Sequence, residues 1–305
     1  PRMENCTIRT NYPFYEYRFY KKGLPLEVTM EAYTPFIPLD EKNSGIPGVF
    51  IKYKITNSSE KEAKVSVCGT MYNFTGFTSY DGYDRLYQDG TPVNTVEQGG
   101  KITGIYYNNE GMDTNLVNYG NIALFTSNEQ VSCKPYWQDG GWWDGAEEFW
   151  QDFREDGELK EDVSTEAVGS NVTASQTPRK VGSVCGKETL GPGETKEFEF
   201  ILTWYFPNRY GWWPDGHCRP EEKSLHDKVW RNYYSTQWKN AKDAARYLFE
   251  NKKFLEEKSR NFAGALYSTT LDADVIESLV SAITVIRSNT CFRIEDGRFF
   301  AWEGC

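Results

Sequence analysis

Long apolar runs are missing from this sequence of 305 residues. No stretch approaches the roughly 18 consecutive apolar residues that a membrane-spanning helix needs, so no integral membrane segment is predicted. Positive charge is also scarce, because 34 lysines and arginines stand against 44 aspartates and glutamates, which leaves a formal net charge of −10. Nucleic acids and anionic membrane surfaces attract basic patches. Neither is therefore an expected partner, and neutral substrates fit better.

Several motifs of nucleotide-binding and hydrolytic enzymes are absent as well. No glycine-rich loop of the P-loop or dinucleotide-binding type follows a strand pattern. A serine triad would have to use one of the two histidines, His217 or His226, and no Gly-x-Ser-x-Gly elbow supports it. The spacing of these histidines from Asp215 and Cys218 matches no zinc pattern well. No cofactor and no metal are therefore expected.

Close cysteine pairs are also lacking. The seven cysteines are scattered along the chain without Cys-x-x-Cys spacing. Such a distribution is typical of reduced thiols, and it predicts a cytoplasmic protein. Four Asn-x-Ser/Thr triplets carry little weight, because such triplets often arise by chance; they begin at Asn5, Asn57, Asn73 and Asn171.

Aromatic residues are abundant, at 16% of the chain. They bury large areas, so a substantial core can form although hydrophobic residues make up only 39%. Residues 73–120, rich in Gly, Asn, Asp and Tyr, are expected to form long loops between short strands. Residues 136–158 are expected to form an aromatic loop. The rings of 136–153 and 204–213 are either platforms for sugar rings or packing between domains, and packing is the favoured interpretation.

Residues 1–206 are predicted to form an antiparallel β-sandwich. Apolar and polar residues alternate over 26–33, 51–56, 65–71 and 197–206. Period two with one charged face is typical of antiparallel strands that are covered on one side. The intervening turns carry Gly, Pro, Asn and Ser, and no helical pattern interrupts the strands. The fold class is therefore expected to be mainly β with an α-helical C-terminal part.

The composition changes after residue 206, and residues 207–222 are predicted to be a linker. Beyond it, apolar residues at steps of three, four and seven predict one long helix or a helix pair; they are Tyr234, Trp238, Ala241, Ala245, Leu248, Leu255 and Phe262. A second helix is expected over about 272–287, with Asp272 or Asp274 as its cap and Arg287 near its C-terminal end. Its apolar stripe comprises Val275, Ile276, Leu279, Val280, Ile283 and Ile286.

The closing residues 295–305 contain the carboxylate of greatest interest. Glu303 follows Trp302 and precedes Gly304. Such a glutamate can serve a glycosidase as nucleophile or as acid/base. An exposed acidic residue in a turn is the commoner interpretation of a single carboxylate, and no partner carboxylate stands at a set spacing. Local pattern alone leaves both interpretations open.

Several segments spread over nearly the whole chain carry a family resemblance. They are 13–14 (Pro-Phe), 33–40 (Tyr-Thr-Pro-Phe-Ile-Pro-Leu-Asp), 44–47 (Ser-Gly-Ile-Pro), 56–58 (Thr-Asn-Ser), 152–157 (Asp-Phe-Arg-Glu-Asp-Gly), 203–209 (Thr-Trp-Tyr-Phe-Pro-Asn-Arg) and 297–304 (Gly-Arg-Phe-Phe-Ala-Trp-Glu-Gly). In these segments the sequence resembles glycoside hydrolase family 116, which includes bacterial β-glucosidases and the non-lysosomal glucosylceramidase. The segments 34–40 and 204–209 are the most specific.

The resemblance implies a β-sandwich (a supersandwich) followed over 223–305 by a linker helix and the first helices of an (α/α)6 catalytic barrel. It implies that Glu303, shortly after Gly297-Arg298-Phe299, is the nucleophile of a retaining mechanism, and Trp302 beside it is expected to pack on the sugar. The family's acid/base is an aspartate far downstream, outside this chain. The implied substrate is a small-molecule β-glucoside or a glycolipid such as glucosylceramide.

Two other interpretations stay open. The chain by itself is a carbohydrate-binding or scaffold module without activity, because the acid/base is missing. Alternatively, it is an all-β interaction domain unrelated to sugars. The first is compatible with a parent enzyme of which this chain is the N-terminal portion.

Overall fold

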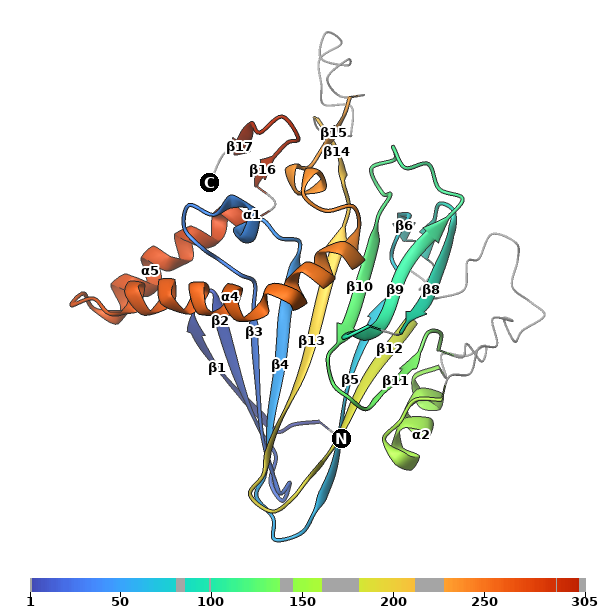
Figure 1. Cartoon of the computed structure of the whole chain (residues 1–305), viewed down its shortest axis with the longest axis vertical. Helices are drawn as coiled ribbons and strands as arrows, with labels where there is room; N and C mark the ends of the chain where they lie inside the picture. The colour runs from blue at the N-terminus through green and yellow to red at the C-terminus, as the bar shows by residue number, and fades with distance from the viewer. Residues whose placement is uncertain are drawn as a thin grey trace.

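The computed structural model describes residues 2–80, 86–98, 100–137, 145–160, 181–211, 228–288 and 290–301. This part of the chain is mainly β, with antiparallel sheets and with its longest helix toward the C-terminal end. Long strands form the body of the molecule, and the 27-residue helix α4 (Ala241–Tyr267) runs across them (Figure 1).

An eight-stranded antiparallel sheet forms the larger layer. Its strands are, in spatial order, β1 (Asn5–Asn11), β2 (Phe14–Tyr20), β3 (Leu26–Tyr33), β4 (Gly48–Asn57), β13 (Thr195–Tyr205), β10 (Asn121–Thr126), β9 (Thr103–Glu110) and β8 (Thr91–Glu97). The pairing of β4 with β13, far apart in sequence, joins the N-terminal strands to the later ones.

A three-stranded antiparallel sheet forms the second layer, in the order β11 (Val131–Lys134), β12 (Val181–Leu190) and β5 (Ala63–Tyr72). Apolar side chains from both sheets share one core, in which Phe198 of β13, Ile105 of β9 and Leu190 of β12 are fully buried. The two sheets therefore face each other, as the alternating pattern indicates.

Helix α4 covers the opposite face of the large sheet. Ala241, Ala244, Ala245 and Leu248 are fully buried there. The three alanines and Gly48 of β4 allow a close approach of helix and sheet, because a Cβ added to Gly48 would lie only 2.6 Å from Leu248 Cδ1. The prediction that the strands are covered on one side is therefore wrong for the central strands, because a helix from the C-terminal part covers the second face.

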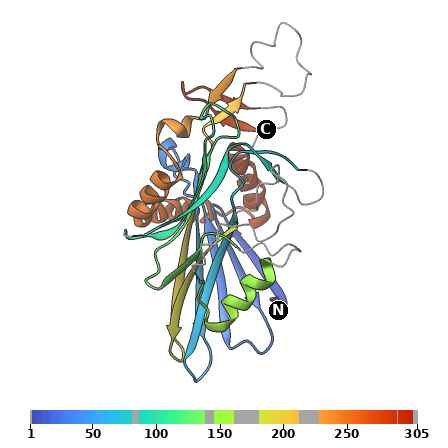
Figure 2. The ribbon, with the colours of Figure 1, turned by 90° about the vertical axis from the view of Figure 1, so that its right-hand side faces the viewer.

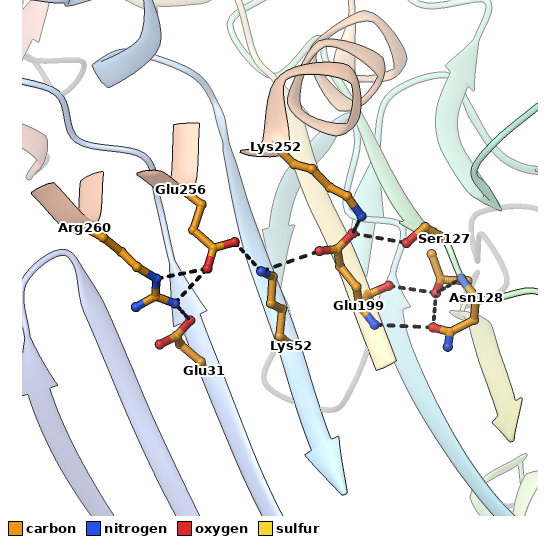
Figure 3. Close-up of polar contacts among 9 residues, drawn as sticks. Glu31, Lys52, Ser127, Asn128, Glu199, Lys252, Glu256 and Arg260 are labelled. Carbon is orange, nitrogen blue, oxygen red and sulfur yellow. Dashed lines mark hydrogen bonds and ion pairs between the residues drawn. The ribbon is translucent and has the colours of Figure 1, made fainter. Parts of the chain in front are cut away.

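A run of ion pairs joins α4 to the charged positions of the sheet (Figure 3). Arg260 of α4 lies 2.5 Å from Glu31 of β3 and 2.8 Å from Glu256 one helical turn earlier. Glu256 in turn lies 2.5 Å from Lys52 Nζ on β4. These charges sit on the strand faces that the alternation assigns to solvent, and they are matched by charges of α4.

The same run continues onto β13. Glu199 there is 8% exposed, and its carboxylate lies 2.8 Å from Lys252 Nζ of α4 and 3.9 Å from Lys52 Nζ. Ser127, just after β10, donates a hydrogen bond of 3.1 Å to Glu199 (Figure 3). A buried carboxylate needs such partners, because burying a charge alone is costly. We call the six residues Glu31, Lys52, Glu199, Lys252, Glu256 and Arg260 the charge ladder.

The expected aromatic loop 136–158 contains a helix, α2 (Gly145–Asp156). Phe149, Phe153 and Leu159 pack with Trp137 against the outer face of the three-stranded sheet, and Trp137 stacks on Phe149 with ring centroids 4.5 Å apart. The side view places α2 and α4 on opposite sides of the strands (Figure 2). These rings therefore pack against a sheet, whereas the sequence favoured packing between two domains.

The expectation of long loops over 73–120 is wrong in part, because β8 and β9 are full strands of the large sheet. Buried asparagines make this stretch look polar: Asn73 donates to Asn94 Oδ1 at 2.9 Å, and Asn109 donates to the Asp89 carbonyl at 2.7 Å. Only the two short strands β6 (Phe77–Tyr80) and β7 (Leu86–Gln88) match the expectation of short elements here.

The two predicted helices are confirmed. The first is one continuous helix, α4, and the 3-10 turn η2 (Tyr233–Thr236) precedes it. The second is α5 (Ala273–Thr284), capped by the Asp272 side chain and followed by the 3-10 turn η3 (Val285–Arg287). Its predicted stripe divides into two faces, because Ile276 and Val280 are buried whereas Val275, Leu279 and Ile286 are exposed.

Part of the predicted linker forms a short antiparallel strand pair, in which β14 (Asn208–Tyr210) pairs with β15 (Val229–Arg231). Residues 212–227, which include Asp215, His217, Cys218 and His226, lie outside the described residues. A further hairpin, β16 (Cys291–Arg293) with β17 (Phe299–Ala301), ends the described chain.

Candidate functional site

A pocket of about 570 Å³ lies where the β3–β4 connection, the end of β13 and the C-terminal hairpin meet. Its lining contains rings from three separate parts of the chain: Trp204 of β13, Tyr233 of η2 and Phe299 of β17. The other lining residues are Thr34, Phe36, Glu41, Lys42, Ser44, Gly45, Ile46, Pro47, Asn232, Tyr234, Gln237, Trp238, Ile286, Arg287, Ser288, Cys291, Phe292 and Arg293.

The β3–β4 connection forms one wall, and local hydrogen bonds fix its course. Asp40 caps the short helix α1 (Glu41–Ser44) by accepting a 3.1 Å hydrogen bond from the Asn43 backbone N–H. The Ser44 hydroxyl accepts from the Ile37 N–H at 2.9 Å and donates to the Ile37 carbonyl at 2.8 Å. Leu39, between Ile37 and Asp40, is fully exposed and has a φ of +66°. An L-residue adopts this backbone conformation only at a cost.

Arg287 of η3 joins this wall to the helical part of the chain. Its guanidinium donates to the Pro35 carbonyl at 2.8 Å and also to the Ser44 carbonyl. Burial lowers the pKa of Arg287, although an arginine remains charged at neutral pH. Arg287 lies at the C-terminal end of the helical segment, as the sequence predicts, and its side chain also donates to two carbonyls of the β3–β4 connection.

A salt bridge lies at the pocket wall between α1 and the C-terminal hairpin. Arg293 of β16 pairs with the Glu41 carboxylate, and its guanidinium lies 3.8 Å from the centroid of the Tyr233 ring. The Tyr233 hydroxyl donates to Glu41 at 3.1 Å. The hydrogen bonds from Arg293 and then Tyr233 lower the pKa of Glu41, so this carboxylate is ionised at neutral pH and suits a fixed acceptor rather than a proton donor.

Backbone contacts hold the C-terminal hairpin against the β14–β15 strand pair. The Glu295 N–H donates to the Arg231 carbonyl at 2.9 Å, and the side chain of Ile294 is 3% exposed. Gly297 makes the turn with a φ of +90°, which a glycine adopts without strain.

Aromatic contacts reinforce the same hairpin. Phe292 stacks on Phe300 at 5.2 Å between centroids, and Phe300 lies 5.3 Å from Trp230. The Arg209 guanidinium lies 3.3 Å from the centroid of Phe292. Arg209 belongs to one of the two most specific segments of the resemblance, so this contact holds that segment against the C-terminal hairpin.

Glu303 and Trp302, the two predicted site residues, lie outside the described residues. The described chain reaches Ala301, which is paired with Cys291 in the hairpin. The hairpin lines the pocket through Phe299 and Cys291.

The two aromatic stretches play different roles. Trp204 lines the pocket and is 37% exposed, which suits a ring that meets a ligand. Trp137 packs under α2, and its indole N–H donates to the Ser183 hydroxyl at 2.8 Å. The remaining tryptophans of the two stretches, apart from the exposed Trp150 of α2, lie outside the described residues.

Two of the four glycosylation triplets have structural roles. Asn57 is fully buried and donates to the Lys61 and Leu190 carbonyls at 2.7 and 3.0 Å. Asn73 is also fully buried, within the asparagine cluster of β8 and β9. Neither side chain is accessible to a glycosylating enzyme. Asn5 is exposed on β1, and Asn171 lies outside the described residues.

Among the described residues, no three His, Cys, Asp or Glu side chains gather as metal ligands. None of the helices in the described ranges is long and apolar enough to cross a membrane. For contacts with a ligand, the pocket offers aromatic faces, backbone groups and the Arg293–Glu41 pair.

Sequence reasoning missed Glu41, Tyr233 and Arg293 as pocket residues. Glu41 falls directly after the segment 33–40, which was singled out on other grounds. Tyr233 and Arg293 carry no local signal, because they meet Glu41 only through contacts between residues far apart in sequence.

A family model described as "beta-glucosidase 2, glycosyl-hydrolase family 116 N-term" matches residues 2–255 of the chain. Solved structures show weaker similarity. A proposed kojibiose phosphorylase from the human microbiome is 9% identical with a TM-score of 0.35, and the match covers 87% of this chain and 25% of the phosphorylase. A polysaccharide lyase is 13% identical with a TM-score of 0.32, and the match covers 61% of this chain and 21% of the lyase. The chain thus spans about a quarter or less of the length of these proteins.

Proposed function

The chain belongs to glycosyl-hydrolase family 116, and on that premise we propose that it is the N-terminal portion of a retaining β-glycosidase that hydrolyses β-glucosides or glucosylceramide, with Glu303 as its nucleophile. The observation that carries the proposal is the convergence of four separate resemblance segments on one pocket. Thr34 and Phe36, Ser44 to Pro47, Trp204 and Phe299 belong to these segments and all line it.

The domain boundaries belong to the same proposal. Residues 1–206 form a β-supersandwich, 207–222 a linker, and 223–305 a linker helix and the start of an (α/α)6 barrel. The 27-residue helix α4 supports the linker-helix assignment, because it lies on the sheet along much of its length and then leads into α5.

The chemistry requires two carboxyl groups about 5 Å apart. Glu303 must be ionised to attack the anomeric carbon and form a glycosyl-enzyme, which water then hydrolyses. The second carboxyl group, which protonates the leaving oxygen, comes from the downstream aspartate that family membership implies. Trp302 beside the nucleophile packs on the sugar and excludes water. The pocket beside the hairpin then receives part of the glucoside or glycolipid.

Replacement of the nucleophile in the full-length enzyme tests this proposal. In Glu303→Ala, we expect kcat for an aryl β-glucoside to fall by at least about 10⁴-fold. Azide should restore turnover and give an α-glucosyl azide, because a small anion can attack the anomeric carbon from the vacated position. The matched control is Glu295→Ala, an exposed glutamate on the same hairpin, which should retain activity. Unchanged turnover in Glu303→Ala contradicts the proposal.

A second candidate function is sugar binding without hydrolysis by the chain alone. The open pocket with three partly exposed rings, Trp204, Tyr233 and Phe299, favours it. Titration of the 305-residue chain with an alkyl β-glucoside should then quench tryptophan fluorescence, and Trp204→Ala should abolish the quenching. Hydrolysis of an aryl β-glucoside by the isolated chain would contradict this second candidate.

Scattered cysteines favour a cytoplasmic location as part of the same proposal. Fluorescence microscopy of the tagged full-length protein would check it, and a signal confined to a secretory compartment would contradict it.

A further inference from the structure

The outer face of the three-stranded sheet carries thiols and hydroxyls beneath an aromatic cover. Cys68 and Thr70 project from β5, and Ser183 and Cys185 from β12. Cys185 is 1% exposed, whereas Cys68 is partly exposed. The cover consists of Trp137, Phe149, Phe153 and Leu159. Free cysteines often pack in such a place as small hydrophobes, so the position of the two thiols relative to each other decides what they can do.

Cys68 and Cys185 are direct partners in the antiparallel register of β5 and β12. Residues directly opposite each other have Cα atoms about 4.5–5.5 Å apart, and disulfides join Cα atoms about 4.4–6.8 Å apart. Directly opposed side chains also project to the same face of the sheet, and both cysteines pack in the same cluster under α2. The backbone therefore already has the spacing that a cross-strand disulfide requires. Both residues are free thiols in this structure.

The two thiols differ in chemical character. The contact between the two thiols favours the thiolate of Cys68 and lowers its pKa, and it raises the pKa of Cys185. The Cys185 thiol itself donates to the Gly186 and Gly157 carbonyls, at 3.5 and 3.6 Å. Thr70 adds a second polar contact, with its hydroxyl 3.9 Å from the Cys68 sulfur. The thiolate is the nucleophilic form of cysteine. Cys68, the more exposed of the two, is therefore the residue that meets an oxidant first.

We propose that Cys68 and Cys185 form a reversible disulfide site, in which a hydroperoxide oxidises Cys68 and Cys185 resolves it. The geometry that carries the proposal is the direct cross-strand pairing under α2. Helix α2, which covers the two cysteines, lies on the opposite side of the strands from α4 (Figure 2). The proposal is independent of the glycosidase assignment.

The reaction balances in two steps. The Cys68 thiolate attacks the terminal oxygen of the hydroperoxide, an S–O bond forms and the O–O bond breaks, and the alkoxide takes a proton to leave as an alcohol. The Cys185 sulfur then attacks the sulfur of the Cys68 sulfenic acid. An S–S bond forms, the S–O bond breaks, and hydroxide leaves as water with the proton of the Cys185 thiol. Two sulfurs lose two electrons in total, and the peroxide gains them.

Thiol mapping of the oxidised protein tests the proposal. The protein is treated with tert-butyl hydroperoxide, blocked with N-ethylmaleimide and digested without reduction. We expect a linked peptide pair containing Cys68 and Cys185, 2 Da lighter than the two reduced peptides together, and its loss after dithiothreitol. Recovery of both cysteines as maleimide adducts, or linkage of either to another cysteine, overturns the proposal.

Two variants separate a specific pair from general oxidation. In Cys185→Ser, Cys68 should stop at the sulfenic acid and react with dimedone, because no resolving thiol faces it. In the control Cys6→Ser, which removes an exposed thiol of β1, the Cys68–Cys185 link should form as in the parent. The thermal midpoint of the parent should rise by about 5 °C on oxidation, and that of Cys185→Ser should not. Equal dimedone labelling of Cys68 in parent and Cys185→Ser contradicts the resolving role.

Discussion

The two faces of the large sheet are covered in chemically different ways. Toward the three-stranded sheet, the interface is made of apolar side chains such as Phe198 and Leu190. Toward α4, the interface contains aromatic rings and alanines together with the charge ladder, in which Lys52 and Glu199 are largely buried. Both interfaces use residues of the same strands at alternating positions. The interface between the sheets therefore depends on the hydrophobic effect, whereas the orientation of α4 also depends on matched charges.

The largest expected effect is in the sheet-to-sheet core. Phe198 is fully buried there, so Phe198→Ala should lower the free energy of unfolding by about 3–5 kcal/mol. Urea unfolding at pH 7 measures it. The matched control is Phe254→Ala on the exposed side of α4, where the ring is 43% exposed and the loss should stay below about 1 kcal/mol. Equal losses at the two positions would contradict the assignment of the core.

The second largest loss of unfolding free energy is expected when the central cation of the charge ladder is removed. Lys52 pairs with both Glu199 and Glu256, so Lys52→Met leaves these carboxylates with fewer partners. We expect a loss of about 2–3 kcal/mol in the same urea assay. Lys64→Met, which removes a lysine from an exposed position on β5, is the control and should change stability by less than about 0.5 kcal/mol.

The pH dependence distinguishes the two interfaces directly. Burial works to raise the pKa of Glu256, but hydrogen bonds from Lys52 and Arg260 offset it and leave the pKa below the usual 4.5. The unfolded chain therefore binds a proton more readily, and the stabilisation present above pH 4.5 is lost as the pH falls through the folded pKa. At pH values under 4.5, the urea midpoint should decrease with falling pH less steeply in Glu256→Gln than in the parent. Phe198→Ala should keep the parental slope, and a parental slope in Glu256→Gln would contradict the role of the ladder.

The smallest expected effect concerns one hydrogen bond at the start of α4. The buried Thr203 hydroxyl donates to the Ala241 carbonyl at 2.7 Å, so Thr203→Val should cost about 1 kcal/mol. Thr56→Val removes one hydroxyl of an exposed pair with Thr195, whose oxygens lie 2.8 Å apart, and its effect should be near zero. Differential scanning calorimetry of the two variants compares them. A larger loss in Thr56→Val would contradict the importance of this contact for α4 docking.

Much of the fold follows from local patterns. The alternation over 26–33 predicts β3 with its observed bounds. The apolar steps from Tyr234 to Phe262 predict α4, although Tyr234 lies in the preceding 3-10 turn η2 and α4 begins at Ala241. The covering of the second sheet face could not be predicted in this way, because Glu31, Lys52 and Glu199 have the pattern of solvated charges until Arg260 and Lys252 are placed opposite them. Similarly, β8 and β9 look like loops because their buried positions include asparagines whose partners lie far away in sequence.

The candidate site likewise has a part that the sequence predicts and a part that it does not. Segments 33–40 and 44–47 carry the family resemblance in the sequence, and residues of both line the pocket. The contact of Arg293 with Glu41 and Tyr233 depends on the placement of the C-terminal hairpin against α1, which no local pattern specifies. Glu303 stays a prediction that rests on the family motif after Gly297.

The most direct test of the central proposal is covalent labelling of the nucleophile. The full-length enzyme is inactivated with a 2-deoxy-2-fluoro-β-glucoside, whose fluorine slows hydrolysis of the glycosyl-enzyme, and is then digested and sequenced by mass spectrometry. We expect the fluoroglucosyl group on Glu303 as an ester, with loss of activity in proportion to labelling. A label on any other residue would contradict the assignment of Glu303 as the nucleophile.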